Sequence, residues 1–247
     1  MNSKGKYALT AILIVIVACS AFYVGLQTQQ NPSATTDKDA LYQLTPYDTF
    51  ITGKYGGVMP YSELEKHGDF GIGTFDGLDG EMIALNDEFY QIPSTGIPRR
   101  AETTQTAPYA TITYFQVDRT FTVSNLNYTQ LKTYIDGQLG TSSDVIYGIK
   151  VIGTFEWAQT RSPQKQSEPY QNITKALETQ SVFNLSDVSA IAVGFWFPPS
   201  MSGIDYAGYH LHFITDDKSA GGHLLDCIIN NATIEVDIIN NYYLVLP

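Results

Sequence analysis

The sequence predicts a β-rich α/β fold, close to the α+β class, in which two mixed or antiparallel β-sheet units carry few helices. Runs rich in Val, Ile, Thr, Tyr and Phe recur along the chain between turns rich in Gly, Asp and Asn, a pattern typical of strands. Only a few short stretches have the apolar spacing of a helix. The chain has 247 residues, 43% hydrophobic and 16% charged, so it can form a sizeable globular core.

Residues 1–30 are predicted to be a signal peptide or an N-terminal membrane anchor. Lys4 and Lys6 precede an apolar, almost uncharged run over residues 7–26. A helix of about twenty apolar residues can cross a bilayer, and the two lysines favour a cytoplasmic N-terminus. A cleaved secretory signal has the same charged start and apolar centre.

A third form of attachment is indicated by residues 16–19, Ile-Val-Ala-Cys, which resemble the lipobox of bacterial lipoproteins. In that motif the cysteine, here Cys19, is lipidated after cleavage. Residues 31–40 are predicted to be a polar tether to the folded part. Each form predicts that the folded part lies outside the cytoplasm, secreted or membrane-anchored, and that only the N-terminal segment contacts the membrane.

An N-terminal β-rich unit is predicted over residues 41–140. A short helix near its start could be capped by Ser62 and ended by Gly68. The glycines and aspartates of residues 76–80 mark a tight turn between two strands. The predicted elements, in order, are a helix at 60–68, a hairpin at 71–85, strands at 88–92, 111–117 and 120–123, and a helix at 127–139.

A second β-rich unit is predicted over residues 141–247, and it contains three of the four histidines. Cys227 lies in an apolar run and is predicted to be a buried, inert thiol. The predicted elements are a strand at 145–155, a polar loop at 160–170, a short helix at 173–180, a strand at 189–197, a histidine-bearing strand from 208, and strands at 224–229 and 233–239.

The three histidines of this unit form a candidate metal site. His210 and His212 are two residues apart in a strand, so their side chains point to the same face. A polar turn over residues 215–222 reverses the chain and brings His223 back. Three neutral imidazoles with an open fourth position are the ligand set of a catalytic zinc site. The alternative is a pair of hydrogen-bonded strand histidines and an unrelated loop histidine.

Charge and motif content exclude other classes of ligand. The formal net charge is −11, so no basic surface is expected to neutralise the phosphates of a nucleic acid. The chain contains neither a P-loop nor a G-x-G-x-x-G motif followed by a helix, so nucleotide binding has no support.

Three motifs occur in an order and at separations that resemble the α-acetolactate decarboxylase family. They are Gly-Thr-Phe-Asp-Gly-Leu-Asp-Gly-Glu at 73–81, Thr-Arg-Ser-Pro-Gln-Lys-Gln at 160–166 followed by Pro169 and Tyr170, and the histidine segment at 208–223. The resemblance covers roughly residues 40–247. It implies a two-part α/β structure with a zinc site at the junction of the parts, and a homodimer as the assembly.

By this resemblance the zinc ligands would be His210, His212 and His223, and the reaction would be loss of carbon dioxide from 2-acetolactate to give acetoin. The substrate is a small 2-hydroxy-3-keto acid. When a β-keto acid loses carbon dioxide, electrons remain on the former keto oxygen, where a Lewis acid such as Zn²⁺ can stabilise them. No organic cofactor is then needed, because the keto group accepts the electrons.

The resemblance also assigns three residues around the metal. Glu81 matches an acidic residue that faces the site and is a candidate acid or base. Arg161 matches the arginine that engages the substrate, for which a guanidinium offers a bidentate fork. Thr74 lies where the family lines the pocket. Each has an alternative: a solvated hairpin end for Glu81, a surface position for Arg161 and an ordinary strand position for Thr74.

One feature of the family has no counterpart. The family has a second active-site glutamate beyond the last strand, whereas 24 residues follow His223 in this sequence (247 minus 223). Glu235 and Asp237 alternate with apolar residues and are predicted to lie on the polar face of a strand, and neither matches the missing glutamate.

Two alternatives to the decarboxylase have the same histidines. One is a non-catalytic, surface-anchored zinc-binding protein derived from this fold. The other is a zinc hydrolase or hydratase that uses the three histidines to activate water, although that reading leaves the Glu81 and Arg161 motifs unexplained.

Overall fold

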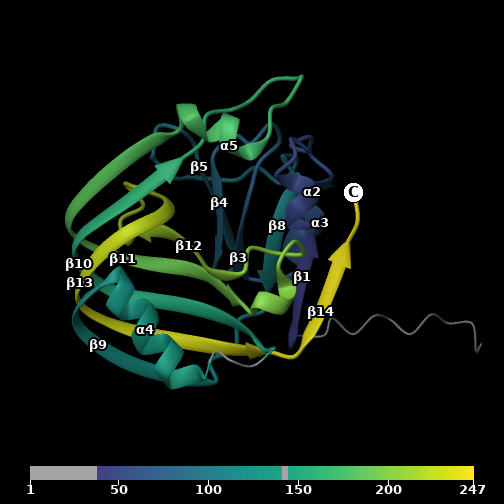
Figure 1. The fold of residues 1–247 in the computed structure, drawn as a ribbon. Helices are drawn as coiled ribbons and strands as arrows, with labels where there is room; N and C mark the ends of the chain where they lie inside the picture. The colour runs from purple at the N-terminus through teal and green to yellow at the C-terminus, as the bar shows by residue number, and fades with distance from the viewer. Residues whose placement is uncertain (1–37, 141–143) are drawn as a thin grey trace, which may run out of the picture. The chain divides into compact units, whose positions relative to one another are not determined.

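The computed structural model describes residues 38–140 and 144–247, and residues 38–247 form one compact unit. The predicted signal peptide or anchor, and most of the tether, lie outside the described residues. Within them, no helix combines the length and the apolar character needed to cross a membrane. Strands make up most of the secondary structure (Figure 1), so the predicted β-rich fold with few helices is confirmed.

The first sheet has seven strands in the order β14-β1-β8-β3-β4-β5-β6. Only β1 and β14 pair in parallel; the other neighbours are antiparallel. The predicted hairpin is β3 with β4, and the predicted strand at 88–92 is β5. The bounds are β1 Ala40–Leu44, β3 Phe70–Thr74, β4 Glu81–Leu85, β5 Glu88–Ile92, β6 Arg99–Arg100, β8 Tyr109–Thr113 and β14 Asn241–Val245.

The second sheet contains the long strands of the chain, in the order β10-β11-β12-β13-β9. Because β13 pairs with β10 as well as with β12, strands β10 to β13 close into a ring. Figure 1 shows these strands curving around one side of the molecule. The bounds are β9 Arg119–Asn127, β10 Ile146–Ser162, β11 Ser181–Phe197, β12 Gly208–Thr215 and β13 Gly221–Ile239; a small ribbon pairs β2 Met59–Pro60 with β7 Thr106–Ala107.

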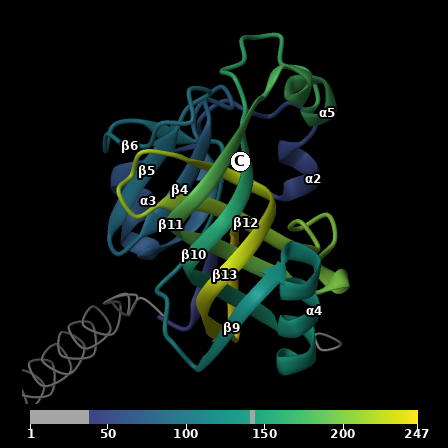
Figure 2. The same cartoon turned by 90° about the vertical axis from the view of Figure 1, so that its left-hand side faces the viewer.

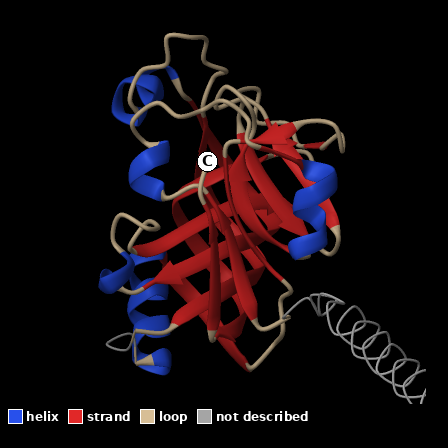
Figure 3. Ribbon diagram, turned by 90° about the vertical axis from the view of Figure 1, so that its right-hand side faces the viewer, coloured by secondary structure: helices blue, strands red, loops and turns tan. Residues whose placement is uncertain are grey.

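The helices lie outside the strands (Figure 3) and are mostly a single turn. Only α4 is long. It corresponds to the helix predicted at 127–139; Asn127 and Gln130 form a capping box at its start, and Gly140 ends it in the left-handed region. It lies beside β9 (Figure 2). The bounds are α2 Tyr47–Phe50, α3 Tyr61–Leu64, η1 Glu65–His67, α4 Tyr128–Leu139, α5 Ile173–Ala176, η2 Leu177–Thr179 and η3 Pro199–Met201.

The predicted helix at 60–68 corresponds to α3 followed by η1, and it ends at Gly68 as expected. Its predicted cap is wrong. Pro60 is the N-cap, and Ser62 lies inside the first turn, where its backbone N–H donates to the carbonyl of Thr103. The short helix at 173–180 is confirmed as α5 and η2.

Three predicted boundaries in the second half are wrong. Strand β10 continues to Ser162, so residues 160–162 are strand and not loop, and β11 begins at Ser181. The strands expected at 224–229 and 233–239 are one strand, β13. The cause is pairing on both sides, because β10 pairs with β11 and β13 along almost its whole length. At Thr154 and Phe155 the register shifts by one residue, so Asn230 is left out of the pairing and β13 continues past it as one strand.

The two sheets exchange strands. Strand β9, which precedes residue 140, pairs with β13, and β14, at the end of the chain, pairs with β1. The predicted division between 41–140 and 141–247 stays a prediction about folding units. An apolar cluster joins the sheets, and it includes Leu41, Phe70, Ile72, Ile83 and Ile92 from the first and Val193, Phe195, Phe197 and Ile214 from the second.

Candidate metal centre and substrate cavity

The strand register places the three histidines on one face of the second sheet. His212 on β12 pairs with His223 on β13, and His223 in turn lies opposite Arg161 on β10. Residues directly opposite each other in antiparallel strands share a face, so these three side chains form a row. His210, two residues before His212, points to the same face. The ligand atoms of the three histidines all lie within 4.8 Å of one another.

The backbone beside His223 needs glycine. Gly222 has φ of +142°, and a Cβ atom there would lie 2.4 Å from the carbonyl oxygen of Arg161. Only glycine allows this approach of β13 to β10. The glycine before His223 in the sequence motif therefore has a structural reason next to the site.

The imidazoles are in the form that a metal requires. Nδ1 of His212 lies 2.8 Å from the carbonyl oxygen of Met82, so Nδ1 donates and Nε2 keeps its lone pair. Nε2 of His212 and Nδ1 of His210 are both buried without a hydrogen-bond partner. Burial lowers the pKa of His212 to about 3, and those of His210 and His223 well below their usual value, with Arg161 acting in the same direction.

A cluster of neutral imidazoles with unpartnered, buried nitrogen atoms fits a divalent metal ion. Buried polar atoms are normally satisfied, and two of the four unsatisfied ones among the described residues belong to these converging side chains. Imidazole nitrogen is a preferred ligand of Zn²⁺ and other first-row divalent ions. The geometry therefore supports the predicted metal ligands.

Glu81 and Thr74 come from the first sheet and face this row from the other side. They are cross-strand partners at the end of the β3–β4 hairpin. Oε2 of Glu81 lies 3.5 Å from Nε2 of His212. Burial raises the pKa of Glu81 to about 7, and the positive charge of Arg161 opposes that rise. Oγ1 of Thr74 donates to the carbonyl oxygen of Gly80 at 2.6 Å, so towards a ligand it can only accept.

Arg161 lies on strand β10 and not in the polar loop that the sequence predicts. Its guanidinium lines the cavity, and Nη1 donates to Oε1 of Gln180 at 3.0 Å. All six residues predicted from the sequence, from both sheets, therefore line one cavity of about 160 Å³. They are Thr74, Glu81, Arg161, His210, His212 and His223.

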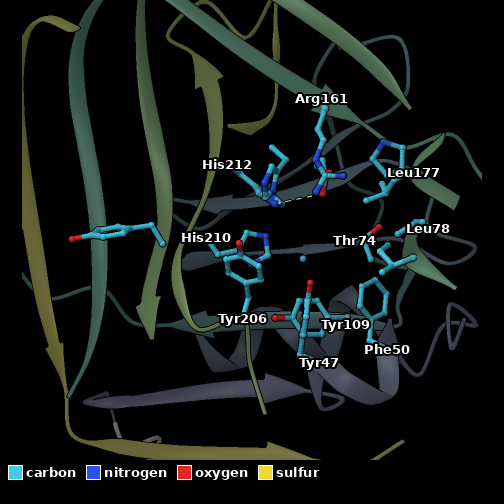
Figure 4. A pocket seen from close by; sticks show the side chains of 16 residues that line it. Tyr47, Phe50, Thr74, Leu78, Tyr109, Arg161, Leu177, Tyr206, His210 and His212 are labelled. Atoms are coloured by element: carbon cyan, nitrogen blue, oxygen red, sulfur yellow. Dashed lines mark ion pairs between the residues drawn. The ribbon is translucent and has the colours of Figure 1, made fainter. Parts of the chain in front are cut away.

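Tyrosines form the wall opposite the arginine. Figure 4 shows Tyr47, Tyr109 and Tyr206 on one side of the cavity, and Arg161 with His212 on the other. The ring of Tyr206 lies edge-on to His210, at 5.6 Å between centroids. Apolar side chains close the remaining wall, among them Phe50, Leu78 and Leu177. The cavity thus combines a cation and a candidate metal site with an aromatic wall suited to a small organic acid.

A buried carboxylate supports the tyrosine wall. Asp205 is 1% exposed and accepts hydrogen bonds from the Tyr109 hydroxyl at 2.7 Å, from Oγ1 of Thr111 at 3.0 Å and from the backbone N–H of Tyr206. Burial raises the pKa of Asp205 to about 6, although these hydrogen bonds lower it. The side chain links strand β8 to the segment that carries Tyr206.

The raised pKa of Asp205 predicts a pH dependence of stability. Between about pH 4 and pH 6 the folded protein keeps the proton on Asp205, whereas the unfolded chain loses it. The stabilisation that comes from this difference is therefore present at low pH and is lost as the pH rises through 6. In wild type the free energy of unfolding should decrease as the pH rises across this range, and Asp205→Asn is expected to make that decrease smaller by up to about 3 kcal/mol. Urea unfolding at a series of pH values measures it. Exposed Asp216→Asn is the control, and parallel curves for Asp205→Asn and wild type would contradict the prediction.

Other residues considered from the sequence lie elsewhere. The fourth histidine, His67, stacks on Tyr42 with ring centroids 3.7 Å apart, outside the metal cluster. Glu235 forms an ion pair with Lys150 at 2.6 Å. Asp237 is buried rather than on a polar face, and accepts the backbone N–H of Gln116. Cys227 is a buried free cysteine, and burial raises the pKa of its thiol to about 12, as expected for an inert thiol.

The sequence analysis did not identify the tyrosine wall, Asp205 or Gln180. Tyr206 lies only four residues before His210, and that proximity could have indicated it. Tyr47 and Tyr109 belong to a one-turn helix and a strand far from every motif, so only the packing of the two sheets reveals their role.

Comparison with known proteins gives a consistent result. A family described as alpha-acetolactate decarboxylase matches residues 41–247. A protein of that name from Methanosarcina mazei is 43% identical over 210 residues, which are 85% of this chain and 73% of that protein. The one from Klebsiella aerogenes is 36% identical over 93% of this chain and 88% of its own. The crystal structure of alpha-acetolactate decarboxylase from Bacillus subtilis has a TM-score of 0.81 at 34% identity, covering 84% of this chain and 89% of that one.

Proposed function

Because the chain belongs to the alpha-acetolactate decarboxylase family, as its sequence predicts, we propose that it removes carbon dioxide from 2-acetolactate with Zn²⁺ bound by His210, His212 and His223. One observation carries the proposal: the row of Arg161, His223 and His212 faces Glu81 across a cavity sized for a small acid. A cation, a metal site and a buried carboxyl group then surround the same ligand.

Arg161 is suited to binding the substrate carboxylate. Its guanidinium is half-buried, forms no ion pair among the described residues and donates one of its hydrogen bonds to a neutral amide. Its remaining N–H groups can form the bidentate pair that a carboxylate accepts. Fixing the carboxylate in this way also fixes the carbon–carbon bond that breaks.

The three histidines would hold Zn²⁺ with a coordination position open to the substrate oxygens. When bound, the ion would supply a Lewis acid for the negative charge that develops on the former keto oxygen. The Met82 carbonyl, by accepting from Nδ1 of His212, keeps the other ring nitrogen of that residue directed at the site.

Glu81 would act as the acid or base that transfers the proton. Loss of carbon dioxide leaves an electron pair on the carbon skeleton, and one proton added to that carbon gives acetoin. A carboxyl group whose pKa is close to 7 can hold and release a proton near neutral pH. Aromatic and aliphatic side chains, among them Phe50 and Leu78, line the rest of the cavity in which this carboxyl group lies.

The test is an acetoin assay on the protein with racemic 2-acetolactate, combined with metal analysis. We expect acetoin and carbon dioxide in equal amounts, loss of activity on chelation, and recovery on adding Zn²⁺. Undiminished turnover by metal-free protein would overturn the metal-dependent reaction. Bound zinc without acetoin would favour a non-catalytic zinc protein, and turnover of esters or hydration of carbon dioxide instead would favour a hydrolase or hydratase.

A further inference from the structure

The hydrogen bonding of Arg161 is sparse for a guanidinium in a cavity. Among the ion pairs of the described residues none includes Arg161, and its side chain donates one hydrogen bond, to Oε1 of Gln180. A guanidinium has five N–H groups and no acceptor, so the oxygen of the Gln180 amide must face it. Gln180 is thus the one described side chain that fixes where this cation points.

Gln180 is itself held in place by the segment that it ends. This segment leaves β10 after Ser162 and returns to β11 at Ser181. Its helix α5 is anchored by the N–H of Ile173, which donates to the carbonyl of Ile51, and by Ala176, which is buried with Phe50 and Tyr109. The Gln180 N–H then donates to the carbonyl of Leu177 at 3.2 Å.

The segment also forms part of the cavity. Ile173 and Leu177 line it together with Arg161, and Figure 4 labels both Leu177 and Arg161 at the cavity. Gln180 lies one position before Ser181, which pairs with Ser162, the neighbour of Arg161. The wall of the cavity and the support of its cation therefore belong to one short piece of chain.

The amide is chemically suited to this position. A neutral acceptor orients the guanidinium without cancelling its charge, so the charge stays available to a ligand carboxylate. A carboxylate in the same place would form an ion pair with Arg161 and compete with that ligand. We propose that Gln180 is a positioning residue that holds the Arg161 guanidinium ready for the carboxylate of the substrate, an inference that rests on the proposed function.

The experiment compares Gln180→Leu and Gln180→Glu with wild type in the zinc-loaded protein. Leucine removes the acceptor, and glutamate keeps it but adds a competing charge. Each is expected to raise KM for 2-acetolactate about tenfold while kcat changes less than about threefold, because a hydrogen bond to a charged group is lost or the charge is neutralised. The increase for Gln180→Glu should shrink at high salt, where ion pairs are screened.

A matched control lies between β10, the strand of Arg161, and β11, the strand that follows Gln180. Nε2 of Gln159 on β10 donates to Oδ1 of Asn184 on β11 at 3.1 Å, outside the cavity. Gln159→Leu should leave KM and kcat at wild-type values. In an Arg161→Met background, Gln180→Leu should raise KM no further, because Gln180 acts through the guanidinium.

A second measurement is independent of turnover. The Kd of 2-hydroxy-2-methylpropanoate, a hydroxy acid with no keto group to react, is measured by calorimetry on the same zinc-loaded variants. We expect it to rise about tenfold for both Gln180 variants. If wild type produced no acetoin but both Gln180 variants still bound the hydroxy acid more weakly, the proposed function would be overturned and the role of Gln180 would stand. Two results would overturn that role. One is a folded Gln180→Glu variant with wild-type Kd and KM, and the other is a Gln180→Leu substitution that raises KM as much in the Arg161→Met background as in wild type.

Discussion

His212→Ala is expected to abolish stoichiometric zinc binding and to lower kcat/KM for 2-acetolactate by at least about a hundredfold, since losing even an outer partner of a metal ligand costs 10- to 100-fold. His212 is 1% exposed, its Nε2 lies 3.5 Å from Oε2 of Glu81, and its ring centroid lies 5.2 Å and 5.4 Å from those of His210 and His223. It is also oriented by the Met82 carbonyl. Metal analysis of the purified variant and the acetoin assay measure the two effects.

The fourth histidine provides a matched control for this variant. His67 stacks on Tyr42, and it belongs to no metal cluster among the described residues. His67→Ala should keep both the zinc content and the activity of the wild type. Full activity of His212→Ala at wild-type zinc content would show that the cluster is not the metal centre. If the variant kept zinc but lost activity, His212 would act in the reaction and would not be needed for metal binding.

Glu81→Gln is expected to lower kcat by about 10²- to 10⁴-fold, the range typical of a lost general acid or base. The substitution keeps the shape of the side chain but removes its ability to exchange a proton. Glu81 is 7% exposed, and within residues 38–140 and 144–247 its one ion-pair contact is with His212. We therefore expect KM to change little and the zinc content to stay unchanged, which steady-state kinetics and metal analysis can establish.

The control for Glu81→Gln is Glu63→Gln, a change of the same kind at a glutamate that pairs with Lys66 at the surface. It should have wild-type kcat. Loss of zinc in Glu81→Gln would assign the glutamate to metal binding instead. A wild-type kcat with full zinc would exclude it as the proton donor and direct attention to the tyrosine wall.

Much of the site could be predicted because its residues lie in short local patterns. The spacing of His210 and His212 defines a shared strand face, and the turn that follows brings back His223. Glu81 and Thr74 lie in one hairpin motif, so the same local pattern places both. The errors came where pairing outweighed local composition: the polar residues around Arg161 looked like a loop, but hydrogen bonds to β11 and β13 on both sides keep them extended.

The sequence by itself determined the family, the β-rich fold and the identity of the candidate metal ligands, because these depend on residue types at fixed short spacings. Tertiary structure decided which distant residues complete the cavity. Tyr47 and Tyr109 join the histidines in one cavity because the two sheets pack across a shared apolar cluster, and Asp205 supports Tyr109 from behind by a hydrogen bond. The orientation of Arg161 likewise depends on Gln180, nineteen positions away. Such contacts are set by the packing of whole elements, and no local periodicity encodes them.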